Sequence, residues 1–174
     1  SQIVNPIYNT TLNTYDKTVY DDFVNNFSVE WDIMRGLKLK GNFSIERINR
    51  TMDVFKSADH TDFVDATENR GSYTKGNSTT NNYDGNIILS YFTTLKEKHA
   101  LSFNGGWNIQ ETSDDYDSYT VYGFANQALD HPALGTGFKE GAHVTGYATK
   151  TRLMGFLLNM NYSYDDRYFV DASM

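Results

Sequence analysis

The segment between Thr112 and Tyr122 is the part of this sequence best suited to chemistry. Asp114, Asp115 and Asp117 place three carboxyl groups close together. Two carboxyl groups at a set separation are what a glycosidase needs, and carboxylates at alternate positions also suit Ca²⁺. Adjacent acids in a turn-rich loop are more often simply solvated, and the run lacks the Gly and the distant Glu of an EF-hand loop. We therefore expect neither a catalytic site nor a metal site here, and a protein that is not an enzyme.

Other motifs of catalysis and cofactor binding are weak. The piece from Gly135 to Gly137 lacks the third Gly and the Lys-Ser/Thr pair of a nucleotide-binding loop. Cysteine is absent, which excludes a disulfide scaffold and a thiolate metal site. The net charge of -7 disfavours nucleic-acid binding, and no cofactor is expected. The four histidines have no paired-ligand spacing: His60, His99, His131 and His143.

Binding is better supported than catalysis. Tyrosines alternate with polar residues beside Asp and Asn in the same segment, and aromatic faces with carboxylate and amide groups are how proteins hold sugars. Exposed tyrosines of an ordinary β-extension would give the same pattern, so both interpretations stay open. The candidate substrate-binding residues are Tyr116, Tyr119, Tyr122 and Asp117, with Tyr8 and Asn5 as a weaker second group.

The elements that must position these residues are β-strands. Between Leu101 and Ile109, apolar and polar residues alternate, so one face is apolar and the other polar. The same period recurs along the chain and predicts an all-β fold, an antiparallel meander of about six long strands. The predicted strands lie near 22–34, 37–48, 83–95, 99–111, 148–164 and 168–174.

The connections between these strands alternate between short and long. Tight turns are predicted at Arg35, Lys96 and Asp166, whereas the segments 1–21, 49–82 and 112–147 are long and polar. Long structureless loops are uncommon in compact domains. Outer-membrane β-barrels explain them, because their periplasmic turns are short and their extracellular loops long. The chain is therefore predicted to form strands of a transmembrane β-barrel, with the three long segments outside the cell.

Aromatic residues support the membrane interpretation. Tyr and Trp favour the two membrane–water interfaces, and an apolar band of about 25 Å spans about ten residues of a tilted strand. Outward aromatics near both strand ends would form two such girdles. The predicted girdle residues are Trp31, Tyr83, Tyr91, Trp107, Tyr162, Tyr164 and Tyr168.

Several segments resemble one known family. The chain is similar to the barrel of SusC/RagA-type TonB-linked outer-membrane transporters over nearly its whole length. The similarity is strongest in the N-terminal third and in about the last fifteen residues. The segments that carry it are Asn5–Asn9, Asn26–Ile33, Gly36–Gly41 and, most specifically, Asn161–Tyr168 with Asp171–Ser173.

The resemblance implies a barrel of about 22 strands with an N-terminal plug. It also implies a SusD-like surface lipoprotein as a lid, energy supplied by TonB, and import of oligosaccharides or sometimes peptides across the outer membrane. No plug or TonB box is recognisable here, so we expect an internal segment of such a protein, in contact with outer-membrane lipids. The alternative from another class is a soluble β-sandwich, either a carbohydrate-binding or an adhesin module.

Overall fold

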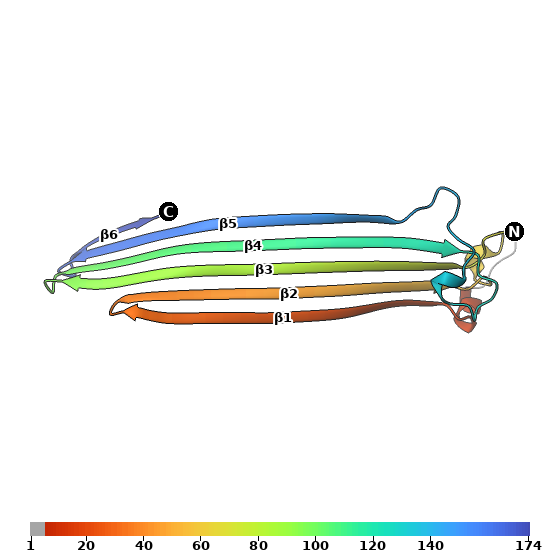
Figure 1. Cartoon of the computed structure of the whole chain (residues 1–174), viewed down its shortest axis with the longest axis horizontal. Helices are drawn as coiled ribbons and strands as arrows, with labels where there is room; N and C mark the ends of the chain where they lie inside the picture. Colours follow the sequence, from red (N-terminus) through yellow and green to blue (C-terminus); the bar gives the residue numbers. More distant parts are fainter. Residues whose placement is uncertain (1–5) are drawn as a thin grey trace. The chain divides into compact units, whose positions relative to one another are not determined.

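The structure is a computed structural model that describes residues 6–174. Its strands form one sheet in the order β1-β2-β3-β4-β5-β6, an antiparallel meander in which chain neighbours are sheet neighbours (Figure 1). The elements are η1 Pro6–Thr11, β1 Tyr15–Met34, β2 Leu37–Lys56, η2 Thr61–Phe63, β3 Ser72–Leu95, β4 His99–Tyr122, η3 Pro132–Leu134, β5 Thr145–Tyr164 and β6 Tyr168–Ser173.

The predicted fold class is confirmed. A sandwich needs two facing sheets, whereas the described residues form a single sheet, which contradicts the alternative fold. Within residues 6–174, no helix has the length and apolarity needed to cross a membrane.

The tight turns lie where the sequence predicts them. Gly36 has φ +82°, and the pairs Lys96-Glu97 and Asp165-Asp166 have φ between 50° and 59°. Two consecutive left-handed residues are what hairpin turns need to match the right-handed twist of the flanking strands. β6 pairs with β5 from Tyr164↔Tyr168 to Asn159↔Ser173, so the last turn sets the register.

The predicted long loops are corrected, because the strands continue far into them. β2 extends to Lys56, β3 begins at Ser72, β4 ends at Tyr122, β5 begins at Thr145 and β1 begins at Tyr15. The connections that remain are 57–71 and 123–144.

Polar residues on both faces hide these strand extensions from a search for apolar alternation. Cross-strand polar pairs stabilise them instead. The pairs join Thr74 with Thr120 (Oγ1 to Oγ1, 2.8 Å), Thr80 with Asp114 (Oγ1 to Oδ1, 2.6 Å) and Thr79 with Asn49 (Oγ1 to Oδ1, 3.1 Å).

The chain divides into two compact units, each made of pieces of several strands. The first, here the loop-bearing unit, comprises Ser1–Asp22, Ile48–Thr80 and Asp114–Thr149. The second, here the apolar-faced unit, comprises Phe23–Arg47, Asn81–Ser113 and Lys150–Met174.

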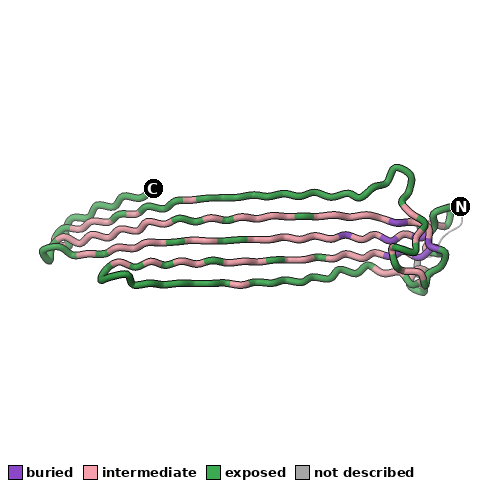
Figure 2. Tube along the Cα trace, in the orientation of Figure 1, coloured by how far each residue is buried: buried purple, intermediate pink, exposed green. Residues whose placement is uncertain are grey.

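The loop-bearing unit holds every buried residue of the described chain (purple in Figure 2). Its core is an aromatic cluster of Phe55, Tyr73, Val121 and Phe124, with Tyr15 and Tyr119 packed against it. The rings of Phe55 and Phe124 meet edge to face at 5.3 Å. The two connections are tied together by backbone hydrogen bonds, among them Phe124 N to Arg70 O at 2.8 Å.

The apolar-faced unit has no buried residue within the described chain; all of its residues are exposed or half-buried. Large apolar side chains occupy alternate strand positions and are open to their surroundings, such as Val29 (65% exposed), Trp31 (59%) and Phe156 (76%). Neighbouring positions on the other face carry polar pairs, such as Lys38 with Glu30 (Nζ to Oε1, 2.6 Å). One face of this unit therefore needs an apolar environment other than its own core.

Candidate functional site

The loop-bearing unit contains a pocket of about 260 Å³ with a mixed aromatic and polar lining. Strands β2, β3, β4 and β5 all contribute to it. Gly76 leaves the space open, since a Cβ there would lie 3.3 Å from Met52 Cε and 3.7 Å from the Tyr116 hydroxyl. The lining residues are Arg50, Met52, Gly76, Asn77, Ser78, Tyr116 and Tyr147.

Two aromatic contacts set the character of this pocket. The rings of Tyr116 and Tyr147 lie 5.5 Å apart and tilted by 33°. The guanidinium of Arg50 sits 4.8 Å above the ring centre of Tyr20, a cation–π arrangement. Arg50 is exposed and has no carboxylate partner among the described residues. The pocket thus offers two aromatic faces, a cationic donor and small polar groups to a ligand.

The structure places the substrate-binding residues predicted from the sequence at different sites. Tyr116 lines the pocket. Asp117 is its strand neighbour and so points to the opposite face, where it accepts a hydrogen bond from Asn77 Nδ2 at 3.2 Å. Tyr119 packs against the aromatic cluster, with its ring 6.3 Å from that of Phe138.

The remaining candidates also lie away from the pocket lining. Tyr122 ends β4, where its backbone N–H donates to Gly137 O at 2.9 Å. Tyr8 is half exposed on η1. Asn5 lies outside the described residues.

Sequence reasoning missed Arg50, Met52 and Tyr147, because it assigned them to loops or to a loop boundary. The signal that identifies them is the extension of β2 and β5. Once Arg50 and Met52 are strand residues two apart, they share a face and line the same pocket.

The acidic and histidine residues have structural partners. Asp114 accepts a hydrogen bond from Thr80, and it points away from Asp115 and Asp117, so the three carboxyl groups do not converge. His60 and His131 accept backbone N–H bonds at the N-termini of η2 and η3. Among the described residues, no group of three His, Asp or Glu side chains is placed to hold a metal ion.

The polar edge of the aromatic cluster is a small hydrogen-bond network. The hydroxyl of Tyr73 donates to Asp53 Oδ1 at 2.8 Å, and Lys75 Nζ lies 3.3 Å from the same oxygen. Burial, together with the bond to Asp53, raises the pKa of Tyr73 well above its usual range. Burial opposes ionisation of Asp53, but the bonds from Tyr73 and Lys75 outweigh it and lower the pKa of that carboxyl.

The predicted girdle residues all lie in the apolar-faced unit, and their membrane role stays a prediction. Near the short turns the hydroxyl of Tyr162 lies 2.7 Å from His99 Nδ1, and the rings of Tyr164 and Tyr168 stack at 6.4 Å. Trp31 and Tyr168 are well exposed, at 59% and 68%.

No protein-family model matches the chain. A TonB-dependent receptor, P26, from Formosa agariphila is 22% identical over 166 residues, which are 95% of this chain and 17% of that protein. Among solved structures, the RagAB peptide transporter superposes with a TM-score of 0.80 at 16% identity, over 92% of this chain and 17% of that one. The RagAB peptide importer in its open-open state gives a TM-score of 0.75 at 15% identity.

The chain has the fold of a SusC/RagA-type barrel segment. The resemblance stated from the sequence is confirmed at the level of fold. The chain spans 17% of the length of the proteins it matches. The similar proteins are a receptor and transporters rather than enzymes, in agreement with the expectation from the sequence.

Proposed function

We propose that this chain is part of the wall of a TonB-dependent outer-membrane importer and that the Tyr116–Tyr147 pocket contacts the cargo. The observation that carries the proposal is the pocket itself, which lies among the polar strand extensions of the loop-bearing unit. Its two tyrosines, the exposed Arg50 and Ser78 form the kind of surface that binds sugars. The cargo is therefore an oligosaccharide.

A peptide cargo is the second candidate. The solved structures with the same fold are those of a peptide transporter and a peptide importer. Arg50, which has no carboxylate partner among the described residues, would supply a bidentate donor for a peptide carboxylate.

The partners follow from the same proposal. The connections 57–71 and 123–144 face the outside and contact a SusD-like surface lipoprotein, and TonB acts through a plug that lies outside this segment. The likeness to the RagAB peptide transporter supports the lipoprotein, and the likeness to a TonB-dependent receptor supports TonB. The barrel wall then provides binding and passage, with no covalent chemistry.

The test is ligand binding by the full-length protein purified from outer membranes, using panels of oligosaccharides and of short peptides. Loss of one aromatic partner by Tyr116→Ala or Tyr147→Ala should weaken binding of the oligosaccharide about tenfold, or ~1.4 kcal/mol. Leu134→Ala is the control, because Leu134 is half exposed on η3 and does not line the pocket.

Binding of peptides alone, weakened by the same two substitutions, would favour the second candidate. If neither tyrosine substitution changed ligand binding, the proposal that this pocket contacts the cargo would be wrong.

A further inference from the structure

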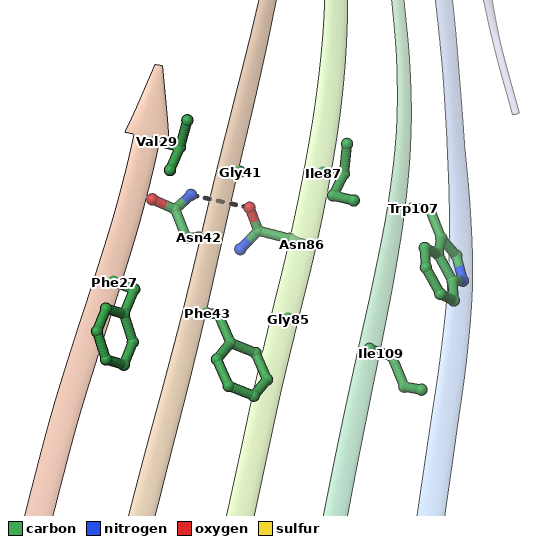
Figure 3. A pocket seen from close by; sticks show the side chains of 10 residues that line it. All are labelled: Phe27, Val29, Gly41, Asn42, Phe43, Gly85, Asn86, Ile87, Trp107 and Ile109. Carbon is green, nitrogen blue, oxygen red and sulfur yellow. Dashed lines mark hydrogen bonds between the residues drawn. The ribbon is translucent and has the colours of Figure 1, made fainter. Parts of the chain in front are cut away.

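The apolar-faced unit contains a groove of about 350 Å³ on the side of the sheet that carries its exposed apolar residues (Figure 3). This volume is at the low end of the range typical of ligand sites, roughly 300–1,000 Å³. Strands β1 to β4 form the groove, and its walls are the side chains of Phe27, Val29, Phe43, Ile87, Trp107 and Ile109.

Two glycines open the groove. Gly41 and Gly85 lie on neighbouring strands between the aromatic and aliphatic walls (Figure 3). A Cβ at Gly85 would meet Ile109 at 3.3 Å and Phe43 at 3.6 Å, whereas a Cβ at Gly41 would have nothing closer than Asn86 O at 3.9 Å. A larger residue at either position would fill the space.

The two amide side chains beside the groove hydrogen-bond to each other. Asn42 and Asn86 alternate with the wall residues, and their side chains bond to each other, Nδ2 to Oδ1, at 2.9 Å. The wall side chains that remain are hydrocarbon apart from the indole N–H of Trp107. The groove therefore suits a hydrocarbon chain and not a hydroxylated ligand.

Two cations lie on the same face, near one end of the groove. Glu111 is two residues beyond Ile109 on β4, about 7 Å along the strand and on the same face. Its carboxylate holds Lys150 (Nζ to Oε1, 2.6 Å) and Arg152 (Nε to Oε2, 2.8 Å). The cluster carries one net positive charge, and both cations stay half exposed, at 59% and 50%.

We propose that this groove holds one acyl chain of a phosphate-bearing membrane lipid, with the phosphate at Lys150 and Arg152. The groove is continuous with the apolar face that an outer-membrane barrel presents to lipid, so a lipid is the neighbour available to it. The net positive charge of the Glu111–Lys150–Arg152 cluster favours an anionic lipid over a zwitterionic one. The inference depends on the membrane location of the chain and not on the import proposal or its cargo.

The experiment uses the full-length protein in phosphatidylcholine nanodiscs that contain a small fraction of a lipid brominated on its acyl chains. Bromine quenches nearby tryptophan, and the emission of Trp107 is obtained as the difference between the wild type and Trp107→Phe. Brominated phosphatidylglycerol should occupy the groove about fivefold more than brominated phosphatidylcholine at the same mole fraction. That ratio corresponds to ~1 kcal/mol for one net charge near the surface.

Filling the groove and removing the charges test the two halves of the proposal. Gly41→Leu should abolish the excess quenching by brominated phosphatidylglycerol, and Gly85→Leu provides a second filling variant if Gly41→Leu fails to assemble. Gly105→Leu is the control, since Gly105 lies on the same face of β4 but does not line the groove. The double variant Lys150→Gln, Arg152→Gln should bring the two lipids to equal quenching.

Equal quenching of the wild type by both lipids would overturn the proposal, as would an excess that Gly41→Leu and Gly85→Leu leave unchanged. Protection of Trp107 from every brominated lipid would also overturn it, because the face would then be covered by protein. Each of these results leaves cargo binding at the Tyr116–Tyr147 pocket untouched.

Discussion

The hydroxyl of Tyr73 lies at the polar edge of the aromatic cluster. It links the cluster by a hydrogen bond to the neighbouring strand β2. It bonds to Asp53, which also holds Lys75. Because the hydroxyl is nearly buried, its ring contributes to the core while its oxygen satisfies a carboxylate at the edge.

Removing this hydroxyl should loosen the two connections that cover the cluster. Tyr73→Phe keeps the ring and deletes one bond to a charged acceptor, at a cost of about 1.5–3 kcal/mol of local stability. Hydrogen–deuterium exchange of segments 57–71 and 123–144 should become faster. Tyr119→Phe is the control, because the Tyr119 ring contacts Phe138 and its hydroxyl makes no hydrogen bond to any residue between 6 and 174. Equal effects of the two substitutions would contradict the role of the Asp53 bond.

The same network predicts a pH dependence. The pKa of Tyr73 is raised in the folded protein above its ordinary value of about 10, so its contribution is complete below pH 10 and is lost as the pH rises further. The lowered pKa of Asp53 acts in the opposite range, and its contribution is lost as the pH falls below about 4 through the folded pKa. Exchange in segment 57–71 should therefore accelerate above pH 10, and this acceleration should be smaller in Tyr73→Phe.

At the scale of single elements, each strand of the apolar-faced unit meets two different environments. Leu158 lies on the apolar face with Phe156 and Met160, and its neighbour Leu157 points to the other face. Leu158→Arg should cost roughly 2–4 kcal/mol if it lies near the bilayer midplane, whereas Leu157→Arg should cost much less. Urea unfolding of the full-length protein in lipid vesicles measures both. Equal costs, or a stable Leu158→Arg variant, would count against the barrel orientation.

The turn between β1 and β2 depends on a residue without a side chain. Gly36 has φ +82°, and a Cβ there would lie 2.1 Å from Phe92 O. Gly36→Ala should destabilise the barrel by more than about 1 kcal/mol and lower the yield of folded protein. Gly41→Ala is the matched control, because the nearest atom to its Cβ would be 3.9 Å away. Heat-modifiability on gel electrophoresis reports the folded fraction of each variant.

At the scale of the whole molecule, the described chain buries very little. Its core is the single aromatic cluster of the loop-bearing unit, and the apolar-faced unit contributes no buried residue. A domain that folds in water needs a core in proportion to its size. Burial within the described residues is therefore too small for the core of a domain that folds in water.

This shortage of burial predicts how the polypeptide behaves in solution. The full-length protein should fractionate with outer membranes and require detergent to remain dispersed, because the apolar face would otherwise associate or aggregate. Sedimentation after removal of detergent measures this directly. A monodisperse species without detergent would contradict the membrane assignment.

Much of this architecture was predictable from local chemistry. Alternation in runs such as Leu101–Ile109 predicted the strands, and Arg35-Gly36 and Asp165-Asp166 predicted the turns. The strand extensions were not predictable in the same way. From Ser72 to Asn82 both faces are largely polar, and between Asn49 and Lys56 polar and apolar residues are mixed on both faces, so neither segment shows an apolar face. Cross-strand bonds such as Thr74 to Thr120 hold these strands and leave no periodic signal.

The sequence by itself determined the fold class, the short turns and the apolar face, because each depends on the types of residues a few positions apart along one strand. Only the tertiary structure decided which residues meet. It put Tyr116 beside Tyr147, placed Tyr119 in the aromatic cluster, and brought Gly41 and Gly85 together in one groove. These contacts depend on register between strands that are far apart in the chain, and register is fixed by hydrogen bonds across the sheet rather than by any local pattern.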